Sequence, residues 1–206
     1  MSWRTVFIGS FLVILGFFAY VFWPAPSVKV VNYPSLGTDI VAFGDSLVAG
    51  IGAEQGNDFV SVLSKEIDEP IVNLGASGDT TAEGLARINI LDSYHPKVVL
   101  LLLGGDDAIQ NVPTDETFQN LAEIIKNIQS RGSIVLLLGV RGGVLSDPFA
   151  SQFEQLSKTY GTAFVPDVLS GLFGNPEYMS DDVHPNDAGY AIIATRIEPV
   201  LKGLLQ

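Results

Sequence analysis

The sequence contains no cysteine, which excludes disulfide bonds, thiol nucleophiles and thiolate metal sites. Basic side chains are also few: 11 Lys and Arg stand against 23 Asp and Glu, for a formal net charge of -12. A chain of this charge repels nucleic-acid phosphates, so we expect no nucleic-acid partner. Only 2 histidines are available as bases for proton transfer. The 206 residues are enough for one domain with a short segment left over.

The remaining segment lies at the N-terminus, where residues 6–23 carry no charge. A run of this length is just long enough to cross a bilayer core. Arg4 precedes the run, so the positive-inside rule places the following residues outside the cytoplasm. We therefore predict a single-pass membrane anchor over residues 1–26, a linker over 27–37, and an extracytoplasmic domain, periplasmic or at the cell surface, over 38–206.

A cleaved signal peptide is the alternative, and it would release a secreted domain. Cleavage requires small residues in an A-x-A pattern, whereas Phe22, Trp23 and Pro24 occupy that region. Trp3 and Tyr20, like Trp23, lie near the ends of the run, as is typical of aromatic side chains at a membrane interface. The sequence therefore favours an uncleaved anchor.

Beyond the linker, short apolar runs alternate with segments of helical periodicity. The apolar runs are rich in Val, Ile and Leu, as in strands buried on both faces. This alternation is typical of an α/β domain with a five-stranded parallel sheet. The predicted strands cover residues 39–43, 71–74, 98–103, 134–138 and 163–165. The predicted helices cover residues 57–67, 81–92, 115–130, 148–160 and 187–204, with Thr80 and Asn186 as N-caps.

Candidate functional residues follow the predicted strands. In a doubly wound sheet the ligand site lies outside the carboxyl ends of the strands. Ser46 follows the first strand, Gly75 the second, and His184 comes after the fifth. His95 precedes the third strand, so it belongs to the opposite edge. We therefore predict that His184 alone can act as a base toward the Ser46 hydroxyl.

A carboxylate is available to orient this histidine. Asp181 lies three residues before His184, so one turn can aim its carboxylate at the far imidazole nitrogen and stabilise the imidazolium. Asp182 could compete for the same role. The serine does not lie in the G-x-S-x-G elbow of α/β-hydrolases, because position 48 is Val. The pattern therefore indicates a different class of serine hydrolase.

Four segments carry a resemblance to a known family. They are F-G-D-S-L at 43–47, N-L-G-A-S-G-D at 73–79, L-G-G-D-D at 103–107 and D-D-V-H-P at 181–185. In this order they resemble the four blocks of the SGNH (GDSL) hydrolases, and most closely those of the bacterial arylesterase, thioesterase I and lysophospholipase L1 branch. The resemblance covers about residues 38 to 200.

The resemblance implies a serine esterase on a flavodoxin-like three-layer α/β/α sandwich. It implies Ser46 as nucleophile, His184 as base and Asp181 as the residue that orients the base. The oxyanion hole would use the backbone N–H groups of Ser46 and Gly75 and the side chain at position 106. No cofactor is implied. The substrates would be carboxylic esters or thioesters, with lysophospholipids and short acyl esters among them.

Position 106 departs from the family pattern, because the family has Asn where this sequence has Asp106. Loss of one oxyanion donor typically lowers kcat by about 10² to 10³. A carboxylate about 4 Å from the oxyanion would add a repulsion of roughly 4 kcal/mol. Three hypotheses follow: Asp106 is protonated and donates its O–H, the two backbone donors suffice for a slow enzyme, or the domain has lost hydrolysis and only binds.

The same scaffold fits two more functions, a membrane-tethered binding module and a carbohydrate O-deacetylase. A metal site at Asp45, Asp106 and Asp107 has no recognisable ligand spacing, and we interpret Asp45 as a turn residue whose carboxylate accepts backbone N–H groups.

Arg141 would meet either an anionic leaving group or an acidic side chain. Six apolar residues in loops would line an acyl groove or close the core: Val112, Pro113, Val144, Leu145, Leu172 and Phe173.

Overall fold

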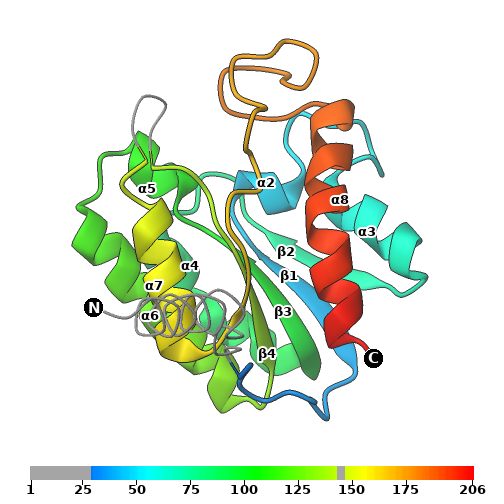
Figure 1. Cartoon of the computed structure of the whole chain (residues 1–206), viewed down its shortest axis with the longest axis vertical. Coiled ribbons are helices and arrows are strands. Elements are labelled where there is room, and N and C mark those ends of the chain that lie inside the picture. Colours follow the sequence, from blue (N-terminus) through cyan, green and yellow to red (C-terminus); the bar gives the residue numbers. More distant parts are fainter. Residues whose placement is uncertain (1–28, 143–146) are drawn as a thin grey trace, which may run out of the picture.

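The computed structural model describes residues 29–142 and 147–206. This part of the chain contains one five-stranded sheet with helices packed around it (Figure 1). All neighbouring strands pair in parallel, in the order β2-β1-β3-β4-β5. The strands are β1 Asp39–Gly44, β2 Ile71–Gly75, β3 Pro96–Leu102, β4 Ile134–Leu138 and β5 Ala163–Val165. The predicted parallel sheet is confirmed, and every strand end lies within two residues of its predicted position. This strand order is flavodoxin-like, and the order reverses between β1 and β3.

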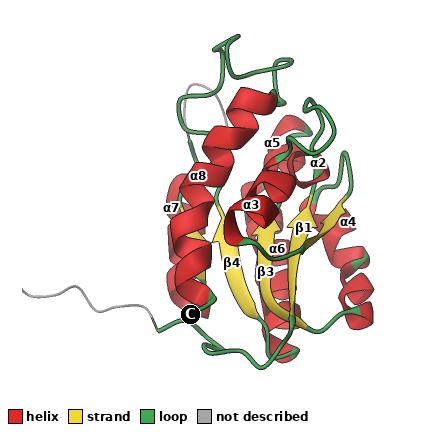
Figure 2. Cartoon of the chain, turned by 90° about the vertical axis from the view of Figure 1, so that its right-hand side faces the viewer, coloured by secondary structure: helices red, strands yellow, loops and turns green. Residues whose placement is uncertain are grey.

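Helices cover both faces of the sheet and make a three-layer sandwich (Figure 2). On one face α3 (Phe59–Ile67) packs against α8 (Asp187–Leu204). On the other face α6 (Thr114–Ser130) packs between α4 (Thr81–Ala86) and α7 (Ala150–Tyr160). With a helix layer on each side, β4 is completely buried, which explains its unbroken apolar sequence.

The predicted helix over residues 81–92 is wrong in its second half. The α-helix ends at Ala86, and residues Ile88–Ser93 form a separate 3-10 helix, η1. A 3-10 helix stacks side chains three residues apart, so Ile88 and Leu91 both enter the core. Two short helices at the edge of the sheet, α2 (Ser46–Ala49) and α5 (Gly105–Ile109), were not predicted, because neither is long enough to show a helical period.

The N-terminal segment enters the domain at the amino edge of the sheet. The N–H of Val31 donates to the carbonyl of Gly161 at 2.8 Å, just before β5. The N–H of Thr38 donates to the carbonyl of His95 at 2.7 Å, just before β3. The predicted membrane anchor lies outside the described residues. Within residues 29–142 and 147–206, no helix is long and apolar enough to cross a membrane.

Candidate active site

Ser46 begins α2, immediately beyond the carboxyl end of β1. The turn is fixed by Asp45, whose Oδ1 accepts the Leu47 N–H at 3.0 Å and caps the helix. The chain is crowded here, since a Cβ on Gly44 would lie 2.0 Å from the carbonyl oxygen of Leu102 on β3. A glycine is therefore required before the turn. Ser46 remains 8% exposed, with its hydroxyl at the edge of a cavity.

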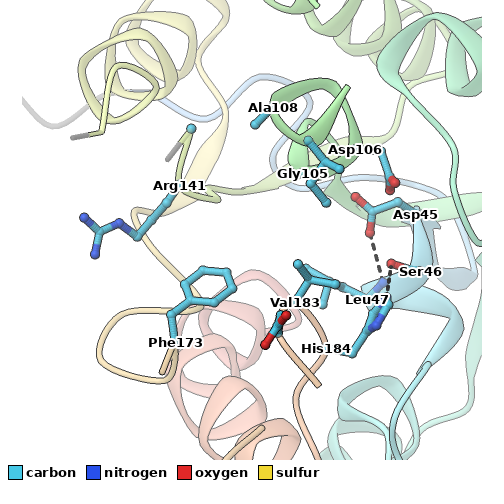
Figure 3. A pocket seen from close by; sticks show the side chains of 13 residues that line it. Asp45, Ser46, Leu47, Gly105, Asp106, Ala108, Arg141, Phe173, Val183 and His184 are labelled. Carbon is cyan, nitrogen blue, oxygen red and sulfur yellow. Dashed lines mark hydrogen bonds between the residues drawn. The ribbon is translucent and has the colours of Figure 1, made fainter. Parts of the chain in front are cut away.

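The loop before α8 brings a histidine and a carboxylate to this hydroxyl. His184 Nε2 lies 3.1 Å from Ser46 Oγ, a contact drawn in Figure 3. His184 Nδ1 lies 2.8 Å from Asp181 Oδ2. The other oxygen of Asp181 accepts the N–H groups of Val183 and His184 at 2.8 and 2.7 Å. The structure therefore aligns the predicted serine, histidine and aspartate in one hydrogen-bonded chain, and Asp182 has no part in it.

The Asp181 carboxylate is held in its ionised form. The hydrogen bond from His184 and the backbone N–H groups lower the pKa of Asp181 to about 2. With an anionic acceptor at Nδ1, the imidazole keeps its proton there and presents an unprotonated Nε2 to Ser46. The arrangement can therefore accept the serine proton.

Three contacts fix the histidine loop and the first turn of α8 to the segment that follows Ser46. The Tyr190 hydroxyl donates to the Ile51 carbonyl at 2.7 Å. The Asp187 carboxylate accepts the backbone N–H of Glu54 at 2.8 Å. At Gly52, whose φ is +95°, a Cβ would lie 2.5 Å from the Pro185 carbonyl oxygen, so only glycine permits this close approach. Residues 138 apart in sequence are thereby held within hydrogen-bond distance.

Gly75, the other predicted backbone donor, lies at the end of β2 and packs against α2. A Cβ on Gly75 would lie 2.2 Å from the nitrogen of Ala49, so the end of β2 touches the α2 backbone directly. The Gly75 N–H donates to Asn73 Oδ1 at 2.9 Å, and Asn73 Nδ2 donates to the Val48 carbonyl at 2.6 Å. In this arrangement the Gly75 N–H already has a partner, which an oxyanion would have to replace.

Asp106 lies in the first turn of α5, half-buried, and lines the same cavity as Ser46 and His184. Burial raises the pKa of Asp106, and the positive charge of His184 opposes this rise. Negative charges on Asp107, Asp79 and Glu83 raise the pKa further. The site therefore shifts the equilibrium of Asp106 toward the neutral carboxyl.

Asp45 has the structural role expected from the sequence, but the environment of its second oxygen was not predicted. Asp45 is 1% exposed, and its Oδ2 has no hydrogen-bond partner within the described residues. Burial raises the pKa of Asp45 to about 8, against the effect of the Leu47 hydrogen bond. In the folded protein the neutral form of Asp45 is therefore favoured below about pH 8.

The cavity beside Ser46 has a volume of about 240 Å³, and most of the surface that lines it is apolar. Figure 3 shows Phe173 and Arg141 on the side of the cavity away from Ser46. Its lining residues are Asp45, Ser46, Leu47, Gly105, Asp106, Ala108, Ile109, Arg141, Gly142, Phe173, Asp182, Val183 and His184. The cavity can hold a short apolar group next to the candidate nucleophile.

Residues 42–192 match the GDSL-like lipase/acylhydrolase family. The chain belongs to this family. It is 33% identical to esterase TesA of Pseudomonas aeruginosa over 181 residues, which cover 81% of this chain and 89% of TesA. It is 27% identical to thioesterase 1/protease 1/lysophospholipase L1 of Escherichia coli K12, over 81% of this chain and 84% of that protein. A crystal structure of TesA, 30% identical, aligns with a TM-score of 0.76 over 81% of this chain and 99% of that chain.

The apolar loop residues of this acylhydrolase do not share one environment: Val112 is half-buried and Pro113 is exposed, and neither lines the cavity or belongs to the core. Phe173 lines the cavity, whereas Leu172 is buried in the core. Val144 and Leu145 lie outside the described residues. Arg141 lines the cavity and forms no ion pair with any acid in the described part of the chain, and its buried Nε has no partner there. His95 lies at the opposite edge, where it precedes β3.

Sequence reasoning missed several residues of the acylhydrolase site. Leu47, Ala108 and Ile109 line the cavity from α2 and α5, the two short helices that no periodicity indicated. Their position directly after strands β1 and β3 was the available signal. Arg87, which contacts the ends of β1 and β2, lies in the turn between α4 and η1, far from the end of any strand in sequence, so the rule of strand ends could not find it.

Proposed function

We propose that this carboxylic ester hydrolase acts through Ser46 as nucleophile, His184 as general base and acid, and Asp181 as the residue that orients the base. The observation that carries the proposal is the chain of contacts from Ser46 Oγ to His184 Nε2 at 3.1 Å and from His184 Nδ1 to Asp181 Oδ2 at 2.8 Å. Ser46, at one end of this series of contacts, lines the cavity, so an acyl group in the cavity can lie beside its hydroxyl.

The reaction then has two halves. Ser46 Oγ attacks the carbonyl carbon of an ester or thioester while its proton moves to His184 Nε2. The histidine returns that proton to the leaving alcohol or thiol, which leaves an acyl group on Ser46. Water, deprotonated by the same nitrogen, attacks the acyl-enzyme, and the histidine then gives this proton to Ser46 Oγ as the carboxylic acid leaves. Asp181, ionised throughout, stabilises the imidazolium in both halves.

The negative charge that develops on the carbonyl oxygen needs donors. The Ser46 N–H at the start of α2 and the Gly75 N–H are the backbone candidates. The third is the O–H of a protonated Asp106, which the half-buried position favours because burial raises its pKa. A carboxylic acid can donate to an oxyanion as an amide does, provided that it stays neutral at the working pH.

The cavity indicates the substrate class. Its walls are formed by Leu47, Ala108, Ile109, Phe173 and Val183, and its volume of about 240 Å³ is small for a ligand pocket. We therefore propose short to medium acyl esters or thioesters as substrates. The esterase and thioesterase/lysophospholipase names of the two relatives support esters and thioesters as substrates, whereas the acyl length rests on the cavity alone.

The proposed location is a membrane surface outside the cytoplasm, with residues 1–26 as a single-pass anchor. The support is the uncharged run over residues 6–23 with Arg4 before it. Extraction of cell membranes with alkaline carbonate should leave the intact chain in the pellet, and added protease should digest the domain in spheroplasts. A chain shortened by signal cleavage and released into the soluble fraction would contradict the anchor.

The catalytic assignment is tested with a fluorophosphonate probe, which labels an activated serine covalently. Wild type should label and release p-nitrophenol from p-nitrophenyl butyrate, whereas Ser46→Ala and His184→Ala should do neither. The matched control is Ser77→Ala, which removes an exposed serine hydroxyl from the loop after β2 and should label as wild type does. Labelling that persists in Ser46→Ala would place the nucleophile elsewhere.

The role of Asp106 is tested by its pH dependence. If the neutral acid donates, wild-type kcat falls as the pH rises through the raised pKa of Asp106, by about tenfold per pH unit. Asp106→Asn keeps a donor at every pH, so its kcat should not fall over the same range. Identical pH profiles of wild type and Asp106→Asn would show that the O–H of Asp106 takes no part.

A further inference from the structure

Arg87 joins the ends of the two strands that precede the proposed oxyanion donors. Its Nη2 donates to the carbonyl of Gly44 at 2.8 Å, and its Nη1 donates to the carbonyl of Leu74 at 3.0 Å. Gly44 is the last residue of β1, and Leu74 directly precedes Gly75 at the end of β2. The Nε of the same guanidinium forms an ion pair with Asp79, in the loop beyond Gly75.

The guanidinium is held on its face as well as on its edges. Its central carbon lies 4.2 Å from the centroid of the Phe43 ring, and Phe43 is fully buried in β1. The Arg87 side chain is only 25% exposed. Because the guanidinium is planar and its donors form a rigid fork, the two carbonyls and the carboxylate fix its position. The contacts therefore hold three backbone segments in one relative arrangement.

We propose that Arg87 is a positioning residue for ester hydrolysis, because it fixes the two turns that carry the Ser46 and Gly75 N–H groups. The carbonyl that it holds on Gly44 also accepts the Ala76 N–H at 2.9 Å, so the turn after β2 is tied to the end of β1. Donors to an oxyanion act only when they lie at the correct distance from it, and a misplacement of about 1 Å can lower a rate by about 10². The inference rests on the proposed function.

The test compares Arg87→Met with a matched control, Arg131→Met. Arg131 also donates to a main-chain carbonyl, that of Asn127 at 2.7 Å, and pairs with Asp92 at 2.7 Å, but it lies at the amino edge of the sheet. We expect Arg87→Met to lower kcat for p-nitrophenyl butyrate by about 10²-fold and to leave KM within about twofold, because the donors act on the transition state. Arg131→Met should keep the wild-type kcat, even where it lowers the melting temperature equally.

Arg87→Lys is the second variant, for the case in which Arg87→Met does not fold. A lysine ammonium can reach one of the two carbonyls but cannot bridge both, so its kcat should lie between those of wild type and Arg87→Met. Wild-type kcat in Arg87→Lys, or equal losses of kcat in Arg87→Met and Arg131→Met, would overturn the inference.

A readout without turnover separates this inference from the proposed function. In a ¹⁵N-labelled protein the backbone amide signals of Ser46 and Gly75 should shift in Arg87→Lys and stay unchanged in Arg131→Met. If wild type hydrolyses no ester, the proposed function fails, but the amide signals still show whether Arg87 fixes the two turns that carry the Ser46 and Gly75 N–H groups. Unchanged Ser46 and Gly75 signals in Arg87→Lys would refute this positioning role.

Discussion

Replacement of Asp45 by asparagine should change how the stability of the protein depends on pH. Asp45 is fully buried, and the pKa of its carboxyl is raised to about 8 by burial, while the negative charges of Asp106 and Asp107 add to the rise. In the unfolded chain the same carboxyl is an ordinary acid, with a pKa near 3.8. Between these two values the folded protein keeps a proton that the unfolded chain releases. Stability must therefore fall as the pH rises through this window.

The size of the effect follows from linkage. Each pH unit between the two pKa values lowers the free energy of unfolding by about 1.4 kcal/mol. Over the roughly three units from about pH 4.5 to about pH 7.5 the wild type loses about 4 kcal/mol through Asp45 alone. Asparagine keeps the oxygen that accepts the Leu47 N–H and cannot ionise, so this loss is absent in Asp45→Asn. At low pH the amide adds an unpaired N–H in place of the O–H, at a cost of about 1 to 3 kcal/mol.

The assay is urea unfolding of both proteins at a series of pH values, since urea carries no charge and does not screen the site. The quantity to plot is the stability of Asp45→Asn minus that of wild type, in which the titration of the other groups largely cancels. This difference should rise by about 4 kcal/mol between about pH 4.5 and about pH 7.5. A flat difference would refute the reasoning, because it would mean that Asp45 is ionised in the folded protein.

Three further predictions concern the site and its supports. Asp181→Asn should lower kcat by about 10⁴, because its amide would donate to His184 Nδ1 and select the tautomer that cannot accept the serine proton; steady-state kinetics at constant pH measure this. Gly52→Ala should lower both melting temperature and kcat, because the new Cβ would lie 2.3 Å from the Ser180 oxygen at a φ of +95°; a kcat equal to wild type would show that the loop can move aside. Thr81→Val should cost about 1 to 3 kcal/mol in urea unfolding with little change in KM, because it removes the hydroxyl that donates to buried Asp107 at 2.5 Å.

The sheet could be predicted because its strands are buried on both faces. β4 is apolar at every position, and a burial pattern of this kind is typical of a central parallel strand. The N-caps at Thr80 and Asn186 were equally local signals, and both are present. The end of α4 could not be predicted, because Arg87 leaves the helix to make contacts with β1 and β2, which are distant in sequence.

The relative positions of Ser46, Gly75 and His184 follow from the rule that parallel strands end at one edge. The distances between them do not follow from that rule, since they depend on tight backbone contacts at Gly52 and Gly75. The hydrogen bond from Asn73 Nδ2 to the Val48 carbonyl is a further example, because it depends on how the end of β2 packs against α2. A sequence motif therefore identifies which residues meet, and packing decides how they meet.

Position 106 shows how such packing controls chemistry. The base must be neutral to accept the Ser46 proton, and the proposed donor Asp106 must be protonated to donate. The state with neutral His184 and protonated Asp106 contains as many protons as the state with imidazolium and carboxylate, and the attraction between His184 and Asp106 favours the second. A change of pH cannot convert one into the other, because the two states bind the same number of protons. Burial of Asp106 is what restores the productive state, so Asp106→Asn should raise the maximum of the pH profile as well as widen it.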